Sequence, residues 1–228
     1  MTEGIGFDVI SDLHLTPEDS FNWEGKATSL YCLVAGNVSN DPRTIHQTLY
    51  HLAHFYQGVF YVAGSLEYDN VQNIAVRTEE LSRICLSIRN VALLLNNVVI
   101  IDGVAIMGAN GWYGQHIQTD SLSGVRQLED ISYLGHSLEK LQLHMDVKKI
   151  VIVTNSVPDP SLYFGEEDQE IYNQLPPSIC LTNDTEKKVS HWVFGSYNKV
   201  VDTTISDINY INNSYYKRQP YWAKRIEV

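Results

Sequence analysis

An aspartate and a histidine two positions apart follow the first apolar run of the chain. Asp12 and His14 come directly after Val9-Ile10-Ser11. In an extended segment, side chains two positions apart point to the same side, so this carboxylate and imidazole could share one ligand. Such a pair suits a hard or borderline divalent metal ion. The alternative is a helix N-cap beside a solvated histidine, and the spacing alone leaves both interpretations open.

The elements that must position these side chains follow the pattern of a layered α/β domain, because apolar runs of strand length alternate with segments of helical period. Asp41 and Pro42 supply an N-cap and a first helical proline, and they predict a helix beginning there. Two further helices are expected over 70–89 and 119–145, and a long surface loop over 156–188. The expected strands are 4–12, 30–36, 59–64, 91–95, 98–101, 104–108, 149–154, 191–195, 200–204 and 207–211, with a β-meander over 91–108.

Short polar turns close five of these strands. They lie at 11–14, 36–41, 64–67, 154–156 and 195–198. Ligands of layered α/β folds collect at strand ends, so we expect the five turns to converge on one site.

These turns, in this order, resemble the five signature blocks of the calcineurin-like metallophosphoesterase superfamily, and the resemblance extends over nearly the whole chain. Residues 9–15 match the first block intact, and Gly64 with Glu67 matches the frame of the third. Residues 107–113 look like the central strand with its glycine-aromatic turn, 191–195 lead into the fifth block, and 219–222 are similar to the ending of small stand-alone members. The resemblance implies a four-layer αββα sandwich with two mixed β-sheets, formed by residues 1–228 as a single domain.

The resemblance also implies a two-metal site, from which this chain departs. Of the seven ligand positions, only Asp12 and His14 keep the residue of the family. The family has an aspartate, an asparagine and three histidines at the positions that are here Asn37, Ser65, Asn155, Ser196 and Asn198. Leu66 stands at the position of the general-acid histidine. Neutral amides and hydroxyls leave too little charge for two dications, whereas the loops can keep their shape through Asn and Ser hydrogen bonds.

We therefore expect a catalytically inactive pseudo-phosphoesterase with no catalytic residue. It would act as a binding, scaffold or interaction protein, with a protein partner, by self-association, or by sequestering a phosphorylated small molecule. We expect no cofactor beyond one weakly bound Mn²⁺ or Mg²⁺. The alternative is a residual metal-dependent phosphoesterase or phosphodiesterase that uses such a single ion at Asp12 and His14, helped by the amide oxygens of Asn37 or Asn198.

Composition narrows the partner class. Sixteen basic and 27 acidic side chains give a net charge of −11 over 228 residues. This charge disfavours a phosphate-tracking nucleic-acid binder or an anionic-membrane binder. The three cysteines, Cys32, Cys85 and Cys180, have no CxxC spacing and are expected as buried thiols. With no signal peptide or apolar span in the sequence, we expect a cytoplasmic protein or a virus-encoded intracellular one, and the resemblance favours a phage or bacterial origin.

Aromatic residues crowd the C-terminus among basic side chains. Two interpretations remain open: an interaction surface, or a terminal strand whose aromatic side chains cover the sheet. The interface candidates are Tyr215, Tyr216, Arg218, Tyr221 and Trp222. Elsewhere, His46, His51 and His54 on the first helix and the acidic run 166–170 are expected to be solvated surface.

Overall fold

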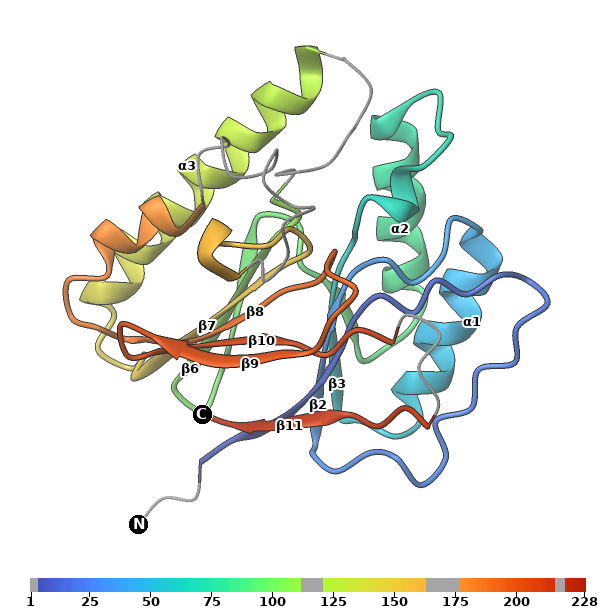
Figure 1. Ribbon diagram of the computed structural model, residues 1–228, viewed down its shortest axis with the longest axis horizontal. Coiled ribbons are helices and arrows are strands. Elements are labelled where there is room, and N and C mark those ends of the chain that lie inside the picture. Colours follow the sequence, from blue (N-terminus) through green and yellow to red (C-terminus); the bar gives the residue numbers. More distant parts are fainter. Residues whose placement is uncertain (1–3, 112–120, 163–176, 216–219) are drawn as a thin grey trace.

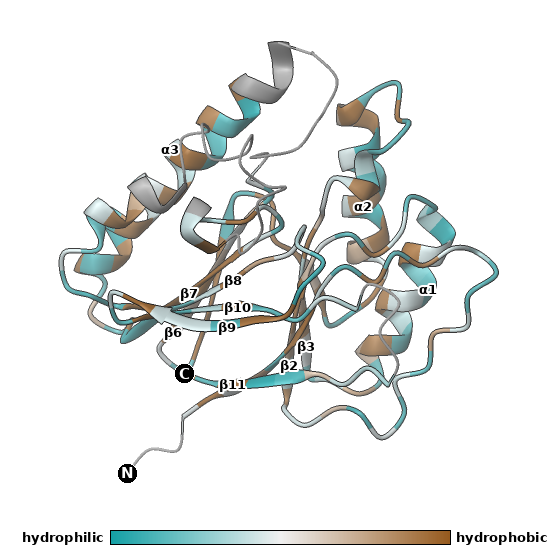
Figure 2. Ribbon diagram, in the orientation of Figure 1, coloured by the Kyte–Doolittle hydropathy of each residue, from teal (hydrophilic) through white to brown (hydrophobic). Residues whose placement is uncertain are grey.

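The computed structural model describes residues 4–111, 121–162, 177–215 and 220–228. Its first sheet has the strand order β11-β1-β2-β3-β4. The strands β1 (Gly6–Ile10), β2 (Tyr31–Ala35), β3 (Gly58–Val62) and β4 (Val91–Leu93) are parallel, and β11 (Lys224–Glu227) pairs antiparallel with β1. β11 is a charged edge strand, and it is hydrophilic in Figure 2.

The second sheet has the order β5-β6-β7-β8-β10-β9. The strands are β5 (Asn97–Ile101), β6 (Val104–Ala109), β7 (Lys149–Thr154), β8 (Val189–Val193), β9 (Val201–Ile205) and β10 (Ile208–Asn212). The middle strands β6, β7, β8 and β10 run parallel, and both edge strands run antiparallel to their neighbours. The sheet is mixed, as expected.

Helices cover the outer face of each sheet, so that the molecule has four layers (Figure 1). α1 (Pro42–Ala53) and α2 (Ile74–Leu86) lie on the first sheet, and α3 (Ser121–Leu143) lies on the second. The short 3-10 helices η1 (Leu66–Tyr68), η2 (Pro160–Leu162) and η4 (Pro177–Asn183) lie in the connections. The expected αββα sandwich is confirmed.

Strand alternation explains the layering. In β1, Phe7 and Val9 belong to the apolar cluster between the two sheets, whereas Ile10 belongs to the cluster beneath α1 and α2. In β7, Val151 faces the other sheet and Ile152 faces α3. Because successive side chains of a strand point to opposite faces, strands that are apolar at every position can fill two interlayer spaces at once.

Local signals account for two of the helix starts. The Asp41 carboxylate accepts a hydrogen bond from Thr44 N at 2.8 Å, and Pro42 occupies the first turn of α1, as predicted. The sequence pattern predicts the second helix from residue 70, but α2 begins after Asn73, whose side chain accepts from Ala75 N and Val76 N. Asparagine at the N-cap fixes this later start.

The meander expected over 91–108 is wrong in its first half. β4 joins β3 in the first sheet, whereas β5 pairs with β6 in the second sheet. Asn96 has a φ of 51°, and the turn there carries the chain from one sheet to the other. Only the β5–β6 hairpin, closed by Asp102 and Gly103, follows the prediction. A short turn between two apolar runs does not distinguish a hairpin from a change of sheet.

The three cysteines are buried and free, as expected. Among the described residues, no helix combines the length and the apolar character needed to cross a lipid bilayer.

Candidate functional site

The polar turns at the strand ends do converge, and their backbone is unusual. Asp12 follows β1, Asn37 follows β2 and Ser196 follows β8, with φ angles of 54°, 56° and 54°. His14 has a φ of 47°. Positive φ is uncommon for residues other than glycine and is tolerated where surrounding contacts impose it. Asp12 and His14 therefore do not lie in the extended segment that the sequence interpretation assumed, and Asp12 is buried whereas His14 is exposed.

Asp12 is at the centre of this arrangement and is wholly buried. Its Oδ1 accepts hydrogen bonds from Asn37 Nδ2 at 2.9 Å and from Ser196 N at 2.8 Å. Its Oδ2 is buried and has no hydrogen-bond partner in the described part of the chain. Burial raises the pKa of the Asp12 carboxyl from 3.8 to about 7, against the lowering effect of the bonds from Asn37 and Ser196.

Asn37 uses its whole amide in bonds across the site. Its Oδ1 accepts from Leu66 N at 3.0 Å and from Ser65 Oγ at 3.3 Å. Its Nδ2 donates to Asp12 Oδ1 and to Ser196 Oγ, the latter at 3.1 Å. Because a backbone N–H can only donate, Leu66 fixes the oxygen on its own side and turns the amide hydrogens toward Asp12.

Asn155 continues the chain of bonds on the other side of Ser196. Its Oδ1 accepts from Ser196 Oγ at 2.7 Å and from Ser65 N at 3.2 Å. Its Nδ2 donates to the carbonyl oxygen of Ala35 at 3.0 Å. Asn37, Ser65, Asn155 and Ser196, which stand where the resemblance implies metal ligands, thus form one hydrogen-bonded network with Asp12, and the hydrogen bonding expected of these Asn and Ser side chains is present.

Glu67 clamps the turns after β2 and β3 together. Its buried carboxylate accepts from Asn37 N at 3.1 Å, Val38 N at 2.7 Å, Gly64 N at 2.8 Å and Tyr61 Oη at 2.8 Å. Burial raises the pKa of Glu67, whereas the backbone donors and Tyr61 lower it. The sequence frame identified this glutamate, but not its role as an acceptor for three backbone N–H groups.

Asp130 on α3 was not singled out from the sequence. Its carboxylate accepts from Gly111 N at 2.7 Å and from Asn96 Nδ2 at 2.9 Å, and burial raises its pKa to about 6. It fastens the helix to the end of β6. The backbone oxygen of the neighbouring Asn110 accepts from Asn155 N at 3.0 Å, so this anchor touches the network of the site. No sequence motif marks such a long-range contact.

The two remaining ligand positions differ from the rest. The side chains of His14 and Asn198 are exposed, and the His14 backbone N donates to Asn37 O at 2.9 Å. Leu66, at the position of the general acid, is partly buried. The hydrogen-bonded network therefore connects the interior positions, whereas His14 and Asn198 lie at the exposed rim of the site.

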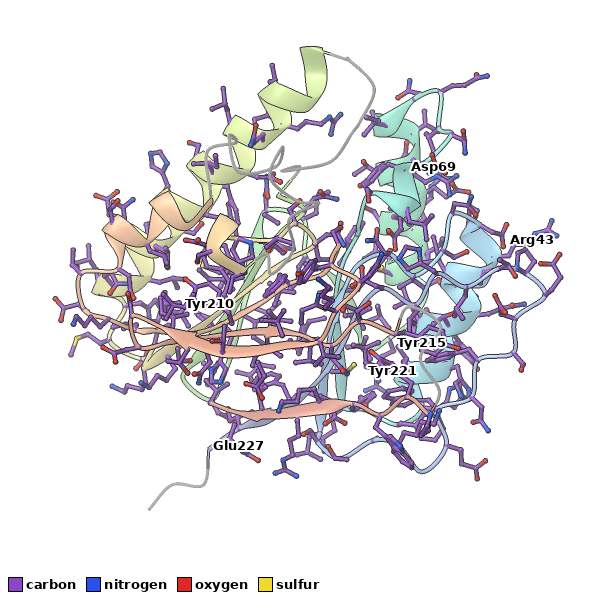
Figure 3. All side chains as sticks on the ribbon, viewed as in Figure 1. Arg43, Asp69, Tyr210, Tyr215, Tyr221 and Glu227 are labelled. Atoms are coloured by element: carbon purple, nitrogen blue, oxygen red, sulfur yellow. The ribbon has the colours of Figure 1, made fainter. Side chains whose placement is uncertain are left out.

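The C-terminal aromatic cluster divides between core and surface. Tyr221 is 2% exposed, its ring lies 5.1 Å from that of Tyr215, and its hydroxyl donates to Asn213 O (Figure 3). Trp222 is 55% exposed. Tyr216 and Arg218 lie outside the described residues. The acidic run 166–170 and the aromatic residues Trp112 and Tyr113 lie outside them as well. Tyr221 therefore belongs to the packing of the sheet, and Trp222 is the exposed aromatic residue.

The donor set does not fit a two-metal centre. The acceptor oxygens of Asn37 and Asn155 already take two hydrogen bonds each, and Ser196 Oγ accepts one bond and donates another. Among the described residues, no three His, Cys, Asp or Glu side chains gather closely enough to hold a metal ion. Two dications need several anionic or imidazole ligands, whereas the described part of the site offers one carboxylate oxygen of Asp12 and the exposed imidazole of His14.

Close packing around the network gives a first prediction. A Cβ at Gly64 would lie 2.6 Å from both Asn37 N and Asn155 Nδ2. We expect Gly64→Ala to lower the free energy of unfolding by about 2 kcal/mol, measured by urea titration, because overpacking forces backbone shifts. Gly135→Ala in α3 is the control, since its Cβ would meet only the Asn183 side chain at 3.1 Å and alanine favours helix. A Gly64→Ala protein as stable as wild type would contradict this tight packing.

Solved structures with a similar fold support the architecture. Phosphopantetheinyl hydrolase from Mycobacterium tuberculosis is 16% identical, with a TM-score of 0.66 over 99% of this chain and 97% of that one. GAP50, the anchor in the inner membrane complex of Plasmodium, is 12% identical, with a TM-score of 0.55 over 93% of this chain and 72% of that one. The sequence matches no protein-family model and no curated protein. At these identities the likeness establishes the fold, and the chain has the calcineurin-like metallophosphoesterase fold.

Proposed function

We propose that this chain is a non-catalytic protein of the metallophosphoesterase fold and that it works by binding. One observation carries the proposal: apart from Asp12, the interior positions at which the resemblance implies ligands hold neutral amides and hydroxyls whose hydrogen bonds are formed within the site. A leucine replaces the general acid, and it has no proton to transfer to a leaving group. Among the described residues, the site thus offers neither a cluster of metal-ligating side chains nor a general acid at position 66, which supports a role without hydrolysis.

The partner in this proposal is a protein or a second copy of the chain. GAP50 shares the fold and is described as the anchor in the inner membrane complex of Plasmodium, which supports an anchoring role for a protein of this fold. Trp222 is the candidate contact, because it is a large aromatic side chain that is 55% exposed. Lys224 and Arg225 follow it on β11 and form ion pairs with Asp202 and Glu227. An aromatic anchor with a charged rim is a common composition of protein interfaces.

Hydrolysis of a chromogenic phosphodiester with added Mn²⁺ tests the absence of catalysis. We expect the wild-type rate to equal that of the Asp12→Asn variant and of buffer, since no metal-bound nucleophile is formed. The variant controls for a contaminating phosphoesterase, which would be equally active in both samples. Turnover by wild type that is lost in Asp12→Asn would overturn the proposal in favour of a residual phosphoesterase.

Light scattering over a concentration series tests the second copy as partner. If Trp222 anchors a dimer, the weight-average mass rises with concentration, and Trp222→Ser abolishes the rise while the variant keeps the circular dichroism of the folded wild-type protein. An exposed aromatic control on α1, Tyr50→Ser, should leave the rise unchanged. A monomeric wild-type protein would exclude a second copy of the chain as the partner.

A further inference from the structure

We infer that Asn37 is the residue that keeps divalent cations out of this site, because it directs amide hydrogens into the space between Asp12 and Ser196. Its Nδ2 lies 2.9 Å from Asp12 Oδ1 and 3.1 Å from Ser196 Oγ. Both oxygens would have to turn their lone pairs to a cation for one to bind between them. This inference goes beyond the proposed function, since it assigns the loss of metal to one side chain and holds whether or not the protein has a partner.

The orientation of the Asn37 amide is determined by its surroundings. Leu66 N–H can only donate, and it lies 3.0 Å from Asn37 Oδ1. A flipped amide would place its NH₂ group against this donor and its oxygen against the Asp12 carboxylate. Both contacts would be repulsive. The amide hydrogens therefore point toward Asp12, and a cation there would face partial positive charge.

Among the described residues, no second carboxylate of the site compensates for the neutral amide. Glu67 is the other buried acid there, but its two oxygens accept four hydrogen bonds, three of them from backbone N–H groups. Asp12 Oδ2 is the one acceptor left without a partner in the described part of the network. A single carboxylate oxygen, whose neighbour Oδ1 already accepts two hydrogen bonds, is a poor site for a hard dication, which prefers several oxygen ligands.

Aspartate in place of Asn37 would make the space beside Asp12 favourable for a cation, because it has almost the same shape as asparagine and carries a negative charge. One oxygen of the introduced carboxylate would still accept from Leu66 N and Ser65 Oγ, while the other would replace the amide nitrogen beside Asp12. Two buried carboxylates in contact repel each other strongly, and a dication between them removes the repulsion. The stability of the Asn37→Asp variant should therefore depend on a divalent cation, whereas the stability of the wild-type protein should not change when the cation is added.

Thermal unfolding of full-length protein, with EDTA and with about 5 mM MnCl₂, tests the inference. We expect the melting temperature of Asn37→Asp to fall below that of wild type in EDTA and to rise by about 5 °C or more in Mn²⁺, while wild type shifts by less than about 1 °C. The double variant, which combines Asp12→Asn with Asn37→Asp, is the matched control. It exchanges the amide and the carboxylate, keeps one charge, and should not respond to Mn²⁺.

Three results would overturn the inference: a wild-type midpoint that rises with Mn²⁺, an Asn37→Asp protein that does not respond, or a double variant that responds as strongly. If Asn37→Asp is unfolded in EDTA, the inference requires Mn²⁺ to restore its circular dichroism, and an unfolded protein under both conditions contradicts it. These outcomes are separate from the test of the proposed function. Turnover by wild type would refute the proposed function. An Asn37→Asp variant whose melting temperature does not respond to Mn²⁺ would refute only the role of Asn37.

Discussion

Replacing Glu67 by alanine should destabilise the protein by about 4 kcal/mol or more, because it leaves buried donors with no acceptor. The donors are Asn37 N, Val38 N, Gly64 N and Tyr61 Oη. Each unpaired donor costs about 1–3 kcal/mol, and relaxation of the turns recovers part of the sum. Urea unfolding of the variant beside wild type measures the difference.

Glutamine at the same position separates the carboxylate from the size of the side chain. Since the backbone partners of Glu67 only donate, the NH₂ group of glutamine must face at least one N–H, and we expect a loss of about 1–3 kcal/mol. Glu79→Gln is the surface control: Glu79 is 71% exposed, and its change should stay within about 0.5 kcal/mol. A Glu67→Gln protein as stable as wild type would show that the clamp does not need an acceptor-only group.

Replacing Asp12 by asparagine should stabilise the protein at alkaline pH. The folded-state pKa of about 7 lies above the ordinary value of 3.8, so the folded protein holds this proton more tightly than the unfolded chain. The stability that the protonated group contributes is present in full below about pH 4 and is lost as the pH rises through 7. At pH 8 the buried carboxylate costs roughly 4 kcal/mol, and asparagine removes that cost.

The pH profile of the difference is the measurement that isolates Asp12. The advantage of Asp12→Asn over wild type should grow by about 1.4 kcal/mol per pH unit between about pH 4 and 7 and level off above. Other groups with raised pKa values, such as Asp130, cancel in the comparison because both proteins contain them. A difference that is independent of pH, or a variant less stable than wild type at pH 8, would contradict a buried carboxylate with no cation beside it.

The sequence predicted most of the fold because the central strands of both sheets, such as β2, β6 and β7, are buried on both faces. Continuous apolar runs such as 149–154 can be recognised without knowing their neighbours, and the periodic leucines of α3 identify the longest helix. Pairing is different. Nothing local distinguishes the turn at Asn96 from a hairpin turn, since the choice of sheet for β4 and β5 depends on partners far along the chain.

The sequence predicted which residues meet at the site, but not all the hydrogen bonds that join them. The order of the turns placed Asp12, Asn37, Asn155 and Ser196 at one edge, and the structure joins them in one network. The acceptor role of Glu67 could not be predicted, because its partners are backbone groups that any sequence would provide. Tyr221 was proposed for a surface on composition, but its contacts with Trp23 and Tyr215 place its ring in the core.

Metal content of the purified protein tests the central claim most directly. The protein is incubated with Mn²⁺, desalted and analysed for metal, with Asn37→Asp treated in parallel. A network of neutral side chains around one carboxylate predicts close to zero Mn per wild-type chain. A ratio approaching one or two Mn per wild-type chain would contradict this account, because the asparagines and serines would then be acting as ligands.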